Sequence, residues 1–150
     1  MIIKKITAKE TYVIRHPILR KGLPLESCKF ENDNNPNSIH LCAIEKDKLI
    51  AIISALPNKC LNFPEKKAYQ IRGVAVLEEY RGKGVASTLM KEIEKIIKEK
   101  YSIDLIWLNS RIKASKLYLK NNYKPYGEVF EVKYSGVHQS FYKSQDLKFN

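Results

Sequence analysis

The chain has 150 residues, a formal net charge of +11 and a hydrophobic fraction of 44%. The length suits one domain, and the apolar fraction can build a core, which excludes global disorder. The longest nearly apolar run spans residues 49–56, far short of the ~20 residues of a membrane helix, and the start has no apolar region typical of a secretory signal. We therefore expect a cytoplasmic protein with no membrane partner.

The N-terminal part predicts a strand, a short helix and a β-hairpin. Thr7 and Glu10 have the spacing of a capping box, and the helix that this box begins should run to about His16, since Pro17 should break or kink it. Lys46-Asp47 separates two apolar runs and predicts the hairpin turn. The expected ranges are a strand at 1–6, a helix at 7–16, loops at 21–24 and 31–37, and strands at 39–45 and 48–56.

The C-terminal part predicts strands around two helices. Apolar residues that include Val85, Leu89 and Ile93 recur at helical spacing and predict a helix from Gly84 to about Tyr101. The expected ranges are strands at 69–77, 103–109, 123–133 and 137–143, with helices at 84–101 and 113–121. The order β-α-β-β-β-α-β-α-β-β indicates a mixed α/β sheet with one strand–helix–strand crossover.

The three cysteines, Cys28, Cys42 and Cys60, are odd in number and widely spaced. Neither a Cys-x-x-Cys pair nor a Cys/His cluster with zinc-ligand spacing occurs, so we predict reduced thiols and no metal site. The positive charge favours an anionic partner, although many lysines alternate with glutamates between 91 and 100, as on a solvated helix face.

A glycine-rich turn precedes the long helix, with the sequence Arg81-Gly82-Lys83-Gly84-Val85-Ala86. Unpaired N–H groups and the positive end of the dipole make a helix start favourable for an anion. Gly82 and Gly84 let the backbone approach a ligand closely, and Arg81 and Lys83 add positive charge. We therefore expect a phosphate or pyrophosphate group to bind this turn.

Three families of glycine-rich loop compete for the segment. A P-loop is excluded because Leu77 stands at the place of its first glycine and Val85 follows Gly84. A Rossmann loop matches residues 82–87 only in part, and Asp104 begins its strand instead of ending it. The pattern R/Q-x-x-G-x-G/A fits residues 81–86 and resembles the signature of the GNAT superfamily, the acetyl-CoA-dependent N-acetyltransferases.

Further residues extend the resemblance from about Arg15 to Lys143. Asn109, Ala114 and Tyr118 resemble the superfamily's second motif, a strand ending in Asn followed by an A-x-x-x-Y helix. Asn122-Tyr123 then replaces the usual Gly-Phe, a departure that concerns packing more than chemistry. Other segments resemble the ElaA-like branch: Leu19-Arg20, Gly22-Leu23-Pro24, Asp33, Ser38-Ile39-His40, Gln70-Ile71-Arg72-Gly73 and Gly136-Val137-His138.

The resemblance implies a single-domain GNAT (acyl-CoA N-acyltransferase) fold over residues 1–150, with a mixed, mostly antiparallel central sheet flanked by helices. It implies acetyl-CoA as co-substrate and acetyl transfer to a primary amine by direct attack in a ternary complex. One strand would pair with the pantetheine amides, and the main-chain N–H of Val74 or Ala75 would polarise the thioester carbonyl. The cofactor-binding residues by motif position are Val74, Ala75, Val76, Arg81, Gly82, Lys83, Gly84, Val85, Ala86 and Asn109.

The resemblance also makes Tyr118 the general acid for the leaving thiolate, where the plain alternative is a core aromatic. The candidate base is His40, expected on a strand beside the acceptor side, with His138 or a water chain as alternatives. Arg72 and Arg111 either bind an acidic acceptor or pair with neighbouring glutamates.

Two other functions are compatible with parts of the sequence. A basic module that binds single-stranded nucleic acid without catalysis would use the net charge and the nine tyrosines, but no recognised binding motif occurs, so we expect no specific nucleic-acid partner. A CoA-binding sensor would keep the fold and lose catalysis, against which Tyr118 argues. The acceptor stays unidentified, and the oligomeric state stays open between a monomer and a homodimer.

Overall fold

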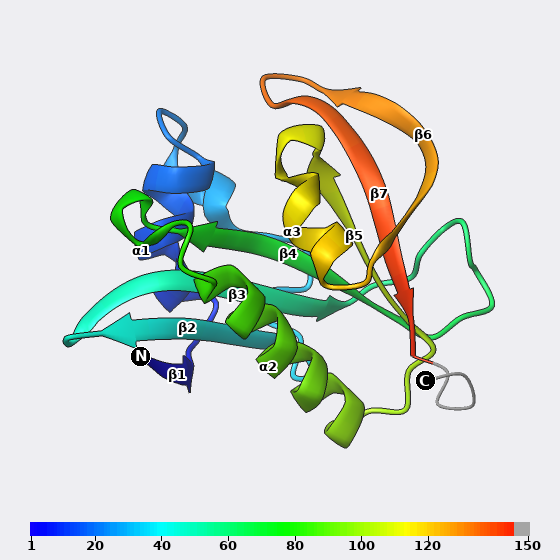
Figure 1. The fold of residues 1–150 in the computed structure, drawn as a ribbon, viewed down its shortest axis with the longest axis horizontal. Helices are drawn as coiled ribbons and strands as arrows, with labels where there is room; N and C mark the ends of the chain where they lie inside the picture. The colour runs from blue at the N-terminus through cyan, green and yellow to red at the C-terminus, as the bar shows by residue number, and fades with distance from the viewer. Residues whose placement is uncertain (146–150) are drawn as a thin grey trace.

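Seven strands form one sheet in the order β1-β2-β3-β4-β5-β7-β6 in the computed structural model, which describes residues 1–145 (Figure 1). All neighbouring strands are antiparallel except β4 and β5, which confirms the expected mixed, mostly antiparallel sheet. The strands are β1 Ile2–Lys5, β2 Ile39–Glu45, β3 Lys48–Pro57, β4 Ala68–Val76, β5 Leu105–Arg111, β6 Lys124–Val132 and β7 Gly136–Ser144. The strand order also shows what the sequence did not predict: β7 lies between β5 and β6.

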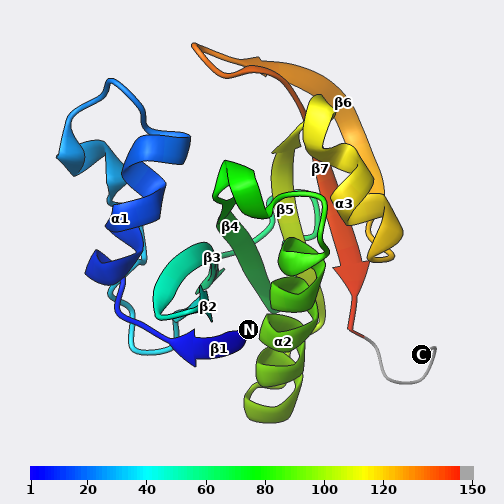
Figure 2. The ribbon, with the colours of Figure 1, turned by 60° about the vertical axis from the view of Figure 1, so that its left-hand side comes forward.

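Helical segments cover both faces of the sheet, and α2 with α3 lies on the face opposite the N-terminal segment that contains α1 (Figure 2). The longer helices are α2 Val85–Lys100 and α3 Ser115–Lys120. The short helical segments are η1 Lys9–Thr11, α1 Tyr12–Ile14, η2 Arg15–Leu19, η3 Leu25–Cys28, η4 Glu78–Tyr80 and η5 Ile112–Ala114.

The main core lies between the sheet and α2. Leu89 and Ile93 of α2 are fully buried, as the helical apolar stripe predicted. Together with the fully buried Met90 they join a cluster with strand residues such as Leu41 and Ile53. A smaller core around Ile14 and Ile52 lies under α1 on the other face. Because β2 and β3 are covered on both sides, both strands are nearly continuous apolar runs.

The first helix begins as predicted but ends later. Thr7 and Glu10 form the capping box, with the Thr7 N–H donating to Glu10 Oε1 (2.9 Å) and the Glu10 N–H donating to Thr7 Oγ1 (3.2 Å). The expected end near His16 is wrong, because a π turn carries the helix to Leu19. The helix therefore passes through Pro17 with a local distortion, which a proline inside a helix requires.

No helix among residues 1–145 is long and apolar enough to span a membrane. Cys28, Cys42 and Cys60 are buried, unpaired thiols, as the sequence predicted. The same part of the chain holds no group of three or more His, Cys, Asp or Glu side chains placed to bind a metal ion.

Candidate active site

The parallel strands β4 and β5 touch only at their beginnings. Ala68, Tyr69 and Gln70 lie opposite Leu105, Ile106 and Trp107. Beyond these pairs the two strands diverge, with β4 and β5 pointing in different directions in Figure 1. The rest of β4 therefore keeps β3 as its neighbour on one side and leaves main-chain groups unpaired by β5 on the other.

The open edge of β4 exposes alternate main-chain groups. The Leu77 N–H donates to the Ile50 carbonyl on β3 (2.9 Å), whereas the Val76 carbonyl accepts from Arg81 Nε (2.9 Å). Since residues along an antiparallel strand alternate between their two neighbours, Ala75 faces β3, and Val76 and Val74 direct their N–H groups to the open edge. Of the two N–H groups expected to polarise a carbonyl, the geometry favours that of Val74.

A β-bulge interrupts β4 next to Val74. Ile52 pairs with Ala75 and Ser54 pairs with Arg72, so two residues, Gly73 and Val74, oppose one residue of β3. Gly73 has φ +65°, a conformation that favours glycine. The bulge re-aims the main chain at the point where the strand edge opens.

The glycine-rich turn lies between β4 and α2. Gly82 and Gly84 have φ values of +75° and +79°, and a Cβ built on either would meet nothing within 4 Å. Gly84 is the N-cap of α2 and supplies no side-chain hydrogen bond, and the first turn of α2 holds no acidic residue. The first N–H groups of α2 are therefore uncapped, beside the exposed Arg81 and Lys83, and the turn suits an anion.

Tyr118 lies in α3 and is 7% exposed. Its ring packs against Tyr123 and Phe141, with centroid distances of 6.2 and 5.9 Å. Burial raises the pKa of Tyr118 to about 12, so the phenol keeps its proton at neutral pH. Asn109 on β5 is exposed, and its Oδ1 accepts from the Ser140 hydroxyl (2.6 Å), which leaves its amide N–H groups directed elsewhere.

His40 belongs to a buried network instead of an open site. Its Nε2–H donates to the Asp33 carbonyl (2.9 Å), so its Nδ1 accepts from the Ser54 hydroxyl (2.6 Å). Ser54 Oγ also accepts from Arg15 Nη2 (3.0 Å). Both ring nitrogens are occupied, and burial lowers the pKa of His40, so the geometry leaves no nitrogen for an acceptor amine.

Arg15 is the centre of that network and is fully buried. It forms a two-point ion pair with Asp33 (2.7 and 3.0 Å) and donates to the Cys28 carbonyl (2.8 Å). Sequence reasoning assigned no role to Arg15 or Ser54. A lone arginine in a short amphipathic segment gives no signal of burial, because its partners come from segments far along the chain.

His138 lies on β7, opposite Arg111 and Phe130. Its Nδ1–H donates to the Gly136 carbonyl (2.9 Å), which leaves Nε2 as the ring nitrogen without a hydrogen bond to residues 1–145. Arg111 donates Nε to Ser135 Oγ (3.2 Å), and no ion pair between Arg111 and a glutamate occurs within residues 1–145.

Comparisons with known proteins identify the family of this chain. Residues 8–123 match the acetyltransferase (GNAT) family. The chain belongs to the GNAT family. It is 36% identical, over 142 residues and 95% of each protein, to the uncharacterised N-acetyltransferase YitI of Bacillus subtilis (strain 168). The protein is thus an N-acetyltransferase by family, and this family uses acetyl-CoA.

Two solved structures are similar to this acetyltransferase in fold. Escherichia coli ElaA has a TM-score of 0.76 at 16% identity, with 95% of this chain and 99% of ElaA covered. An aminoglycoside 6'-N-acetyltransferase complexed with coenzyme A has a TM-score of 0.73 at 15% identity, with 96% and 97% covered. At these identities the similarity concerns the GNAT fold.

The residues of the site fit acetyl-CoA. Acetyl-CoA carries a pyrophosphate, which matches the uncapped start of α2 and its open glycines. It also carries the pantetheine amides, which match an unpaired strand edge. A Cβ in the turn would meet no neighbour, so the space beside Gly82 and Gly84 is free for such a group.

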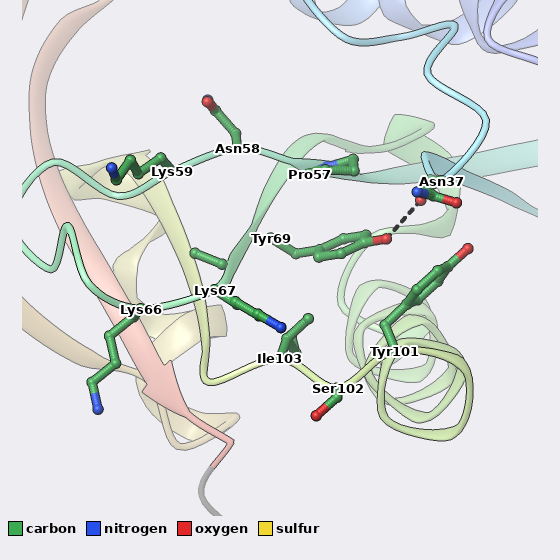
Figure 3. Close-up of a pocket in the computed structure, with 11 residues that line it drawn as sticks. Asn37, Pro57, Asn58, Lys59, Lys66, Lys67, Tyr69, Tyr101, Ser102 and Ile103 are labelled. Carbon is green, nitrogen blue, oxygen red and sulfur yellow. Dashed lines mark hydrogen bonds between the residues drawn. The ribbon is translucent and has the colours of Figure 1, made fainter.

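A cavity of about 650 Å³ lies away from this site, at the beginnings of β4 and β5 (Figure 3). Tyr69 donates its hydroxyl to the Asn37 carbonyl (2.8 Å) and packs on Tyr101, while Lys59 and Lys66 point away from the two rings. Since the paired ends of β4 and β5 separate this cavity from the open strand edge, it takes no part in the site described above.

Proposed function

We propose that this acetyltransferase moves the acetyl group of acetyl-CoA directly to a primary amine in a ternary complex. The supporting observation is the divergence of β4 from β5 beside the uncapped start of α2. A covalent acyl-enzyme has little support, because the three thiols are buried and Ser54 is also fully buried. We further propose that residues 1–150 act as one domain in the cytoplasm.

The proposed donor site has two parts. The N–H groups at the start of α2, with Arg81 and Lys83, hold the pyrophosphate. The open edge of β4 at Val74 and Val76 pairs with the pantetheine amides, and the amide of Asn109 adds a bond from β5. These contacts place the thioester beside the bulge at Gly73.

At the bulge, the Val74 N–H is proposed to donate to the thioester carbonyl oxygen and to stabilise the negative charge that develops there. Tyr118 donates its proton as the C–S bond breaks, and its raised pKa keeps that proton in place until then. The attacking amine loses its proton to water or to His138 Nε2. His40 is proposed to position Ser54 and Arg15 instead of taking the proton, since both of its ring nitrogens have partners.

A screen of primary amines with acetyl-CoA, read as released thiol and as acetylated product by mass spectrometry, tests this function. Amine-dependent thiol release supports it. Tight binding of acetyl-CoA without transfer to any amine would favour a CoA sensor. Oligonucleotide binding at physiological salt that saturating acetyl-CoA leaves unchanged would favour the nucleic-acid module, because nonspecific binding by basic surface is strongly salt-dependent.

A further inference from the structure

Three guanidinium groups surround the ring of Phe30. The Arg15 and Arg72 Cζ atoms lie 3.8 and 4.1 Å from the ring centroid, and the Arg20 Cζ lies 5.3 Å from it. Phe30 itself is 5% exposed. Cation–π contacts of this kind fix guanidinium groups in place but leave their charge uncompensated.

The three arginines differ in their polar partners. Arg15 has the carboxylate of Asp33 (2.7 Å). Arg20 donates Nε to the Ser27 carbonyl (3.1 Å) and Nη1 to the Leu19 carbonyl (3.1 Å). The guanidinium of Arg72 makes neither a hydrogen bond nor an ion pair with any residue in the range 1–145. None of its side-chain N–H donors is thus used by the described part of the chain.

The surroundings of Arg72 call for an anion. Arg72 is half-buried, and burial, followed by repulsion from Arg20 and Arg15, lowers its pKa. The two acidic groups that act on it are Asp33, already paired, and the exposed Glu31, which forms no ion pair with it. Asp33 offsets one of the three arginine charges, so an anion from outside would reduce the positive charge that is left.

Arg72 is also next to the proposed reaction centre. It directly precedes the bulge formed by Gly73 and Val74, so its Cα lies about 7 Å along the strand from that of Val74. Arg72 lies opposite Ser54 in the register of β3 and β4. The Ser54 hydroxyl belongs to the network of Arg15 and His40, which lies on the sheet face that carries α1, opposite α2 and α3. A group bound by Arg72 would thus be close enough to the proposed thioester position for one small molecule to reach both.

On the basis of the proposed acetyl transfer, we propose that the acceptor is a small amine that also carries a carboxylate, and that Arg72 binds this carboxylate. The planar guanidinium matches a carboxylate with two parallel N–H···O bonds. Arg72 is the one guanidinium of the three without a polar partner in residues 1–145, and one such group matches one carboxylate better than a phosphate dianion. The same cluster repels polycationic amines, so Arg72 is a specificity-determining residue.

Matched amines test the proposal with the full chain and acetyl-CoA. Each pair keeps the amine and changes the anionic group: L-alanine with L-alaninamide, and β-alanine with β-alaninamide. 2-Aminoethylphosphonate is the phosphorus-containing arm. Rates are referred to the unprotonated amine, because amidation changes the basicity of the amine. We expect kcat/KM to be about 10- to 100-fold higher for the carboxylate member of at least one pair, the range for hydrogen bonds to a charged group.

Variants of Arg72 assign the effect to this residue. Arg72→Met keeps an unbranched stem over Phe30 and removes the charge, and we expect it to lose the 10- to 100-fold preference, with the carboxylate member slowed more than the amide member. Arg72→Lys keeps the charge without the planar fork and should restore the preference only in part. Arg111→Met, on the other side of the open edge, is the matched control and should keep the preference.

The outcomes separate this proposal from the proposed function. Equal rates for both members of every pair, an equal loss for both members in Arg72→Met, loss of the preference in Arg111→Met instead, or a preference for the phosphonate would overturn the carboxylate assignment and leave acetyl transfer intact. If no amine is acetylated, the proposed function fails. Calorimetric binding of the same carboxylate amines to the CoA-bound protein, compared with Arg72→Met, then still decides whether Arg72 holds a carboxylate.

Discussion

The ring of Phe30 lies where the missing side chain of Gly73 leaves room for it. A Cβ on Gly73 would stand 3.0 Å from Phe30 Cε2 and 3.4 Å from Arg15 Nε, a buried donor with no hydrogen-bond partner within residues 1–145. The loop between η3 and β2, which provides Phe30, is thereby packed directly against the bulge of β4. The proposed acceptor side and the proposed thioester position thus share one tightly packed contact.

Gly73→Ala should destabilise the fold because it combines strain with crowding. The φ of +65° disfavours a side chain, and the contact with Phe30 forces the ring to move. We expect a loss of about 2–3 kcal/mol of unfolding free energy in urea titration. Gly82→Ala, with φ +75° and open space, is the control and should lose only about 1 kcal/mol. Equal losses in both variants would show that the Phe30 contact adds nothing.

His40 should make stability depend on pH. Burial lowers its pKa in the folded state below the ordinary value of 6.5, so the unfolded chain binds the proton more readily. Its stabilising contribution is complete above about pH 6.5 and is lost as the pH falls through the folded-state pKa. We expect His40→Gln to lose less stability than the wild type between pH 7 and pH 5, measured by urea midpoints. A parallel loss in both proteins would contradict this assignment.

Much of the fold could be predicted from local patterns. The capping box of Thr7 and Glu10, the hairpin turn at Lys46-Asp47 and the helix from Val85 follow from short-range chemistry, and the structure has all three. The turn residues Lys46 and Asp47 both have positive φ, as a two-residue hairpin requires. The GNAT signature in residues 81–86 placed the glycine turn at the start of α2, as the structure shows.

The acceptor side could not be predicted in the same way. The network of Arg15, Asp33, His40 and Ser54 joins segments up to 39 residues apart, and none of its members has a local pattern that reveals its partner. His40 was a candidate base because its ordinary pKa suits proton transfer, but the structure surrounds it with two partners. Pro17 also misled, since the sequence predicted an end of the helix near His16 and did not predict the π turn.

Gly84→Asp should abolish binding of acetyl-CoA. A carboxylate at the N-cap would occupy the free N–H groups of α2 and repel the pyrophosphate. At one hundred times Kd, acetyl-CoA stabilises the wild type by about 2.7 kcal/mol, a rise in Tm of roughly 5–10 °C. We expect no such rise in the variant. Gly84→Ala brings the φ strain without the charge, so a shift retained in Ala and lost in Asp assigns the effect to the anion site. A normal shift in Gly84→Asp would place the pyrophosphate elsewhere.

Tyr118→Phe keeps the ring and its contacts with Tyr123 and Phe141 but removes the proposed proton donor. Turnover should fall by about 10²–10⁴, the span of general acid catalysis, with the loss in kcat and little change in acetyl-CoA affinity. Because its pKa is raised to about 12, Tyr118 should cause no alkaline fall in wild-type activity below about pH 11. Tyr123→Phe is the control: it removes a buried hydroxyl that donates to Glu94 (2.8 Å) and should reduce stability without a comparable loss of kcat. A Tyr118→Phe rate within about twofold of wild type, where chemistry limits the rate, would make Tyr118 a core aromatic and leave thiolate protonation to solvent.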